Sequence, residues 1–219
     1  MCEKQIKIQY NVPRCYLDMA RAAMTSLHHP IGREKFRGKY GVEPIANVKL
    51  ALVSVSIIYS YLAVEAFVNA QLYLLWARRH DRSPEATRFL SILKDVDNFE
   101  SLKSSNKVRE LGDRINTLCK IMGYKKPHEI DNALWEKYKK LAEVSRHFLV
   151  HPYPAPMFFQ AHMSRIMEET KAGEYFETAS SLIGHLHDQS RKKRPEWLKG
   201  NVRFRIRGVD LIEDRKDAG

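Results

Sequence analysis

The stretch SRHFLVHPY, residues 145–153, places an arginine, two histidines and a tyrosine at the end of a helical pattern. On a helix His147 and His151 are four residues apart and share a face, while Arg146 lies around the side but is long enough to reach them. A guanidinium suits phosphate oxygens, and an imidazole exchanges protons near neutral pH. Cleavage of RNA by its own 2′-hydroxyl requires such groups. It needs a base for the hydroxyl, an acid for the leaving oxygen and a cation that stabilises the negatively charged phosphorane.

Two other interpretations of the histidine pair stay open. Histidines at a helix end interact favourably with the negative end of the helix dipole, which needs no catalytic role. Two imidazoles at this spacing also suit a metal, with Glu65 or His162 as a third ligand. The chain has no His-Glu-x-x-His motif and no Cys-x-x-Cys pair, so we expect neither a metal nor another cofactor.

Glu65 is the second informative residue, because it interrupts a long apolar segment. Residues 44–79 predict one helix, and residues 50–64 carry no charge. A buried carboxylate needs a partner, for which Arg146 is the first candidate, and Asn69 lies one turn further along the same face. Glu65 then either orients Arg146 or His147, or fixes the register of the helices. Glu65 and the amides within the segment argue against a membrane span and for the central helix of a soluble bundle.

The spacing Arg146-x-x-x-x-His151, at the end of a late helix, resembles the signature of HEPN domains. The stretch from Ala63 to Asn69, AVEAFVN, is similar to the acidic and amide positions that many of these domains carry on an earlier helix. The resemblance covers roughly the helical body. It implies an all-helical, dimeric module with metal-independent ribonuclease activity, in which His151 is the general acid or base, Arg146 holds the phosphate and His147 positions either one.

Tyr153 extends this motif to Arg146-x-x-x-x-His151-x-Tyr153, which resembles the toxins of HEPN and nucleotidyltransferase pairs. In those pairs the partner enzyme attaches AMP to the tyrosine and silences the nuclease. The resemblance therefore implies that Tyr153 is a modification site and that a nucleotidyltransferase-type antitoxin is a partner. The alternative is an aromatic side chain that packs beside two prolines.

The fold class that we predict is all-α, an HEPN-like helical bundle with a small terminal β element. Residues 1–13 hold an N-terminal strand, in which Gln5–Val12 alternates polar and apolar residues, and residues 191–219 hold a basic C-terminal strand and tail. The two terminal strands are expected to pair, within one chain or across a dimer. The bundle spans 14–190, and its helices are predicted at 14–28, 44–79, 83–94, 108–122, 130–151, 157–169 and 175–189.

The charge balance favours a polyanionic partner. The chain has 37 Lys and Arg against 26 Asp and Glu, a net charge of +11 and a pI near 9.6. Candidate nucleic-acid contacts are Arg203, Arg205 and Arg207 on one face of the C-terminal strand, and Lys35 and Arg37 in a glycine-rich loop. Three widely spaced cysteines, with no signal-peptide pattern at the start, indicate a cytoplasmic protein.

The leading prediction is a metal-independent endoribonuclease that acts on RNA as a homodimer and away from membranes, and the resemblance to HEPN domains implies a role in toxin, antiphage or stress biology. Its products would carry 2′,3′-cyclic phosphate ends. One alternative is a non-catalytic HEPN module that binds nucleic acid or nucleotide, or a dimeric interaction protein. A second alternative is a metal-dependent helical-bundle enzyme.

Overall fold

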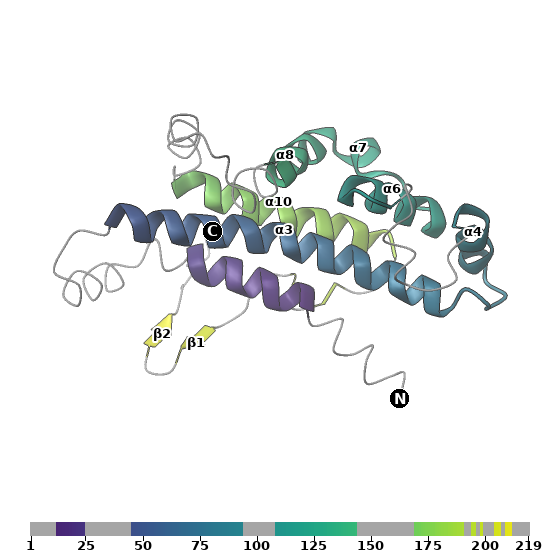
Figure 1. Ribbon diagram of the computed structural model, residues 1–219, viewed down its shortest axis with the longest axis horizontal. Coiled ribbons are helices and arrows are strands. Elements are labelled where there is room, and N and C mark those ends of the chain that lie inside the picture. Colours follow the sequence, from purple (N-terminus) through teal and green to yellow (C-terminus); the bar gives the residue numbers. More distant parts are fainter. Residues whose placement is uncertain are drawn as a thin grey trace, which may run out of the picture.

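The computed structural model describes residues 12–24, 45–93, 108–143, 169–190, 194–195, 198, 204–206 and 209–211. These residues are mostly helical, which confirms the predicted all-α class (Figure 1). The helices are an unlabelled one over 12–24, α3 (Ile45–Ala77), α4 (Pro84–Ile92), α6 (Leu111–Met122), α7 (Pro127–Ile130), α8 (Asn132–Glu143) and α10 (Glu169–Asp188). Two strands follow, β1 (Phe204–Ile206) and β2 (Val209–Leu211).

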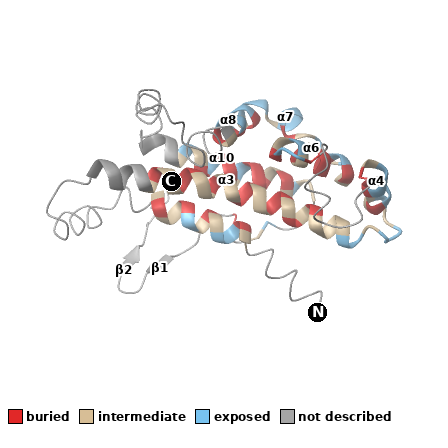
Figure 2. Ribbon diagram, viewed as in Figure 1, coloured by how far each residue is buried: buried red, intermediate tan, exposed pale blue. Residues whose placement is uncertain are grey.

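Helix α3 is the centre of the molecule. Its 33 residues contain no proline or glycine, so nothing in the backbone interrupts it, and its length agrees with the helix predicted over 44–79. It contacts α4, α6, α8 and α10, and α10 runs along it in the same direction (Figure 1). Buried residues, red in Figure 2, occur along α3 and α10 and on the helices packed against α3. They include Ile57, Val64 and Val68 of α3, and Leu182 and Ile183 of α10.

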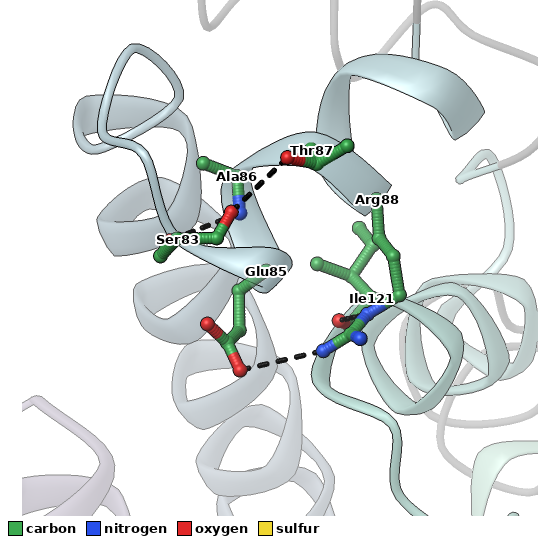
Figure 3. A network of polar contacts seen from close by, with 6 residues as sticks. All are labelled: Ser83, Glu85, Ala86, Thr87, Arg88 and Ile121. Carbon is green, nitrogen blue, oxygen red and sulfur yellow. Dashed lines mark hydrogen bonds and ion pairs between the residues drawn. The ribbon is translucent and has the colours of Figure 1, made fainter.

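The junction of α4 and α6 shows how local sequence signals set helix ends. Ser83 caps α4, since its Oγ accepts a hydrogen bond from the Ala86 amide at 3.1 Å, and Pro84 occupies the first turn. Arg88 of α4 donates from Nε to the Ile121 carbonyl at 2.6 Å, which satisfies an acceptor in the last turn of α6 (Figure 3). Gly123 ends α6 with φ at 71°, as its position in the sequence predicted.

The N-terminal boundary differs from the prediction. Val12 and Pro13, expected at the end of a strand, are the first residues of the helix over 12–24. Proline is compatible with the first turn of a helix, where its missing N–H has no intrahelical acceptor, and here Pro13 is buried. The rest of the predicted strand, residues 5–11, lies outside the described residues.

Three further features of the chain were not predicted. The single turn of α7 lies in a segment where no helix was expected, and α10 begins at Glu169, while the prediction began at Tyr175. Strand β1 lies within the predicted C-terminal strand, but it pairs antiparallel with β2, which places Arg205 opposite Asp210. A pairing of the N-terminal and C-terminal strands is not tested, because residues 1–11 lie outside the described part.

Within the described residues one helix is long and apolar enough to cross a membrane, Leu52–Ala77 of α3. The core helix of a soluble protein meets the same criteria of length and composition, so they do not separate the two cases. In this structure α3 packs against four other labelled helices, and its Ser56 and Ser60 are fully buried. The hydroxyl of Ser60 donates to the Ser56 carbonyl at 2.7 Å, so it needs no partner outside the helix.

Candidate functional site

The described residues include only part of the predicted site. Glu65 and Asn69 lie on α3, one turn apart as expected. The motif residues Arg146, His147, His151 and Tyr153 lie outside the described part, as do His162, Lys35, Arg37, Arg203 and Arg207. The roles assigned to these residues stay predictions.

Glu65 and Asn69 both bind one arginine, Arg114 of α6. The Nη1 of Arg114 donates to Oε1 of Glu65 at 2.8 Å and to Oδ1 of Asn69 at 3.2 Å. These side chains are part-buried: Arg114 is 17% exposed and Glu65 28%, so water screens the ion pair less than it screens a surface pair. Glu65 therefore pairs with Arg114, while a contact with Arg146, the partner that the sequence put forward first, is not tested because Arg146 lies outside the described residues.

Arg114 also holds the chain that enters α6. Its Nε donates to the Val108 carbonyl at 2.8 Å, and its Nη2 donates to the Arg109 carbonyl at 3.3 Å. With the two bonds from Nη1, these contacts use four of the five N–H groups that a guanidinium offers. Arg114 thus has almost no capacity left for a phosphate, and its role is to clamp the 108–110 turn and α6 onto α3.

Tyr138 of α8 interacts electrostatically with Glu65 and Arg114. Its ring is buried, and its hydroxyl has no hydrogen-bond partner among the described residues. Burial raises the pKa of this hydroxyl well above 10, the nearby Tyr61 and Glu65 raise it further, and Arg114 lowers it. The charges of Glu65 and Arg114 thus act on the hydroxyl of Tyr138 in α8. We call Glu65, Asn69, Arg114 and Tyr138 the Arg114 cluster.

The sequence contained a signal for Arg114 that was not used. Arg114 stands among the apolar positions Leu111, Ile115 and Leu118, all buried, so it lies beside the inward face of α6. A cation in that position needs a carboxylate, and Glu65 is the acid in the apolar part of α3. The pairing is between residues 49 positions apart, and nothing in the local pattern fixes such a distant contact.

The described residues hold no group of three or more His, Cys, Asp or Glu side chains placed to bind a metal. His128 is exposed on α7, and His185 is half-buried near the end of α10. The predicted metal ligands other than Glu65 lie outside this part of the chain.

Neither a protein-family model, nor a curated protein, nor a solved structure matches this chain. The resemblance to HEPN domains stays a prediction from the motif residues. The structure identifies Arg114 as the partner of two predicted residues, Glu65 and Asn69.

Proposed function

We propose that this protein is a metal-independent endoribonuclease of the HEPN type, with Arg146 and His151 as its catalytic pair. The observation that supports the proposal is the Arg114 cluster, which contains the acidic and amide residues of the predicted motif, Glu65 and Asn69. Glu65 and Asn69 are fixed on α3, and Tyr138 of α8, the helix that leads along the chain toward Arg146, lies beside them.

Arg146 follows Tyr138 by eight positions in the sequence. Glu65 has an acceptor to offer, because Arg114 binds Oε1 while Oε2 has no partner among the described residues. We assign Glu65 to orient Arg146 or His147 through that second oxygen.

Each group then has one task. Arg146 binds the scissile phosphate through two N–H donors and offsets the charge that develops on the phosphorane. His151 takes the proton of the 2′-hydroxyl or gives one to the leaving oxygen, and His147 positions either group. The products carry 2′,3′-cyclic phosphate and 5′-hydroxyl ends, and DNA is not cut because it lacks the nucleophile.

The test is cleavage of single-stranded RNA by the purified protein in the presence of a chelator. His151→Ala should slow cleavage by roughly a hundredfold or more, the usual loss for a general acid or base. His128→Ala is the matched control, since His128 is exposed on α7 and should leave the rate unchanged. Arg146→Lys should restore little of the activity lost in Arg146→Ala, because an ammonium cannot make the two-point phosphate contact.

Three outcomes would contradict the proposal and favour another function or another site. RNA binding that survives His151→Ala, with no cleavage by the unmodified protein, would indicate a non-catalytic binding module. Loss of cleavage on adding the chelator would indicate a metal-dependent enzyme. Equal losses in His151→Ala and His128→Ala would mean that SRHFLVHPY is not the active site.

The proposed biological setting is a cytoplasmic toxin or defence protein, with Tyr153 as the point of control. AMP on that hydroxyl would place a bulky anion two residues from His151, where it would compete with the RNA phosphate for Arg146. Mass spectrometry after co-expression with a neighbouring nucleotidyltransferase gene should show AMP on Tyr153. Unmodified protein in every such preparation would remove the toxin analogy while leaving the nuclease proposal intact.

A further inference from the structure

One end of the described structure carries an excess of cations. It lies where α3 and α10 end, beside α4 and the end of α6 (Figure 1). Residues 78–88 and 120–130 hold seven Arg and Lys against three Asp and Glu. The cations are Arg78, Arg79, Arg82, Arg88, Lys120, Lys125 and Lys126, and the acids are Asp81, Glu85 and Glu129.

Hydrogen bonds join these segments, which are far apart in the sequence. Arg88 of α4 reaches the Ile121 carbonyl of α6 at 2.6 Å (Figure 3). The Lys125 amide donates to Oε1 of Gln189, just beyond α10, at 2.8 Å, and the Gln189 side chain donates back to the Lys125 carbonyl at 3.1 Å. These bonds join α4 to the end of α6, and the segment after α6 to the end of α10.

The turn after α3 lies at this same end of the structure, next to α4. The Asp81 amide donates to the Arg78 carbonyl at 2.9 Å, which folds the chain back toward α4. Arg82 directly precedes the cap residue Ser83, and about 1.5 Å of rise per residue puts Arg88 about 9 Å further along the helix axis.

Some of these cations already make contacts within the fold. Arg79 lies over the Trp76 ring at 4.4 Å and donates to the Trp76 carbonyl at 2.9 Å, and Arg88 binds Glu85 as well as Ile121. The side chains of Arg78, Arg82, Lys120 and Lys125 are exposed and make no ion pair with a described residue. We call these four residues the basic end.

Helix dipoles do not account for the whole excess. The C-termini of α3, α6 and α10 contribute about half a negative charge each, and the N-terminus of α4 about half a positive one. Together they leave about one negative charge, which is smaller than the excess of cations over acids in the two segments. Cationic potential remains at the surface and is available to a polyanion.

We propose that the basic end binds the phosphate backbone of single-stranded RNA. The choice of RNA rests on the nuclease function proposed above, and the basic end adds a docking surface for the strand on rigid helices. Exposed arginine and lysine side chains without partners suit successive phosphates. An anionic membrane fits less well, because the large apolar side chains exposed in the described part, Met19, Leu90 and Ile130, lie on three different helices and form no apolar face.

The test compares two triple variants in a His151→Ala background, in which RNA cleavage is expected to be slow. The first is Arg78→Gln/Arg82→Gln/Lys125→Gln, and the control is Lys137→Gln/Lys139→Gln/Lys140→Gln, which removes three exposed cations from α8. Fluorescence anisotropy with a labelled uridine oligonucleotide gives the affinity across a salt series. A single-stranded RNA contact contributes about 0.7 to the slope of log affinity against log salt, so the first variant should reduce the slope by about 2 and the affinity by roughly tenfold or more at low salt.

The control variant should bind nearly as tightly as its parent. Equal losses in both variants would overturn the proposal, because they would show an effect of net charge alone, and so would unchanged binding in the first variant. Vesicles with anionic lipid form a second arm: lost vesicle binding with intact RNA binding would assign the basic end to a membrane instead. Because both triple variants carry the same His151→Ala background and meet the same RNA, a difference between them reports on the basic end whether or not the unmodified protein proves to be a nuclease.

Discussion

Arg114 makes more polar contacts than its partners on α3, and its loss should be costly. In Arg114→Met four hydrogen bonds disappear and the part-buried Glu65 carboxylate loses its partner. Hydrogen bonds to charged groups contribute about 1.5–3 kcal/mol, so we expect a loss of about 2–3 kcal/mol in the free energy of unfolding, measured in urea. Lys139→Met is the control, since it breaks an ion pair with Glu136 in which both side chains are about half exposed. That change should cost less than about 1 kcal/mol. Equal losses in the two variants would contradict the proposed role of Arg114 in holding α6 against α3.

Cys119 should make stability depend on alkaline pH. Burial raises the pKa of this thiol from 9.0 to about 12. The folded state therefore keeps its proton while the unfolded state loses it, so the contribution is complete below pH 9 and decreases as the pH rises toward 12. At about pH 10.5 the native protein should lose about 2 kcal/mol more than Cys119→Ala does, relative to pH 8. Parallel losses in the two proteins would show that the thiolate forms readily in the fold.

Glu65 and Asn69 show what a sequence reveals at the scale of single residues. A carboxylate and an amide in an otherwise apolar helix indicate that a polar partner exists, and the structure supplies one for both. The partner's identity depends on how α6 packs against α3, which no local pattern contains. Arg114 was therefore missed, although its place among apolar neighbours was visible.

Two glycines of the α6 region allow a matched test at the scale of an element. Gly123 has φ at 71°, where a side chain is strained, so Gly123→Ala should cost about 1–2 kcal/mol. Gly112 lies in the first turn of α6 with only ordinary contact to Trp135, at 3.9 Å from an added Cβ. Gly112→Ala should stabilise by about 0.5–1 kcal/mol, because alanine loses less conformational freedom in a helix. Thermal unfolding with shifts of the same sign would contradict the assigned end of α6.

The helices were predicted best where strong local signals mark their ends. Ser83 with Pro84 begins α4, and Gly123 ends α6, because capping and positive φ act over a few residues. The start of α10 was predicted at Tyr175, six residues after its start at Glu169. The helix continues through Gly173, where an added Cβ would make only ordinary contact with the Met24 sulfur, at 3.6 Å. The single turn of α7 is too short to show a period.

At the scale of the whole molecule the long apolar helix α3 raises the question of what covers its outer side. Val55, Ile58, Leu62 and Ala66 recur at intervals of three and four and are only half-buried, whereas Val53, Ile57, Val64 and Val68 are buried completely. The sequence indicated an apolar helix but not which of its faces the other helices of the chain would occupy.

We predict that this half-buried face of α3 pairs with a second copy of the chain, which would also bring two Arg146/His151 sets into one basic cleft. Leu62→Glu places a charge in the middle of the face and should convert a dimer to a monomer in light scattering at micromolar concentration. Leu90→Glu is the control, because Leu90 is 43% exposed on α4 and its replacement should leave the dimer intact. If the cleft is shared, RNA cleavage should fall with the dimer in Leu62→Glu and persist in Leu90→Glu. A native protein that scatters as a monomer would exclude the shared cleft, and the single chain would then have to complete the site alone.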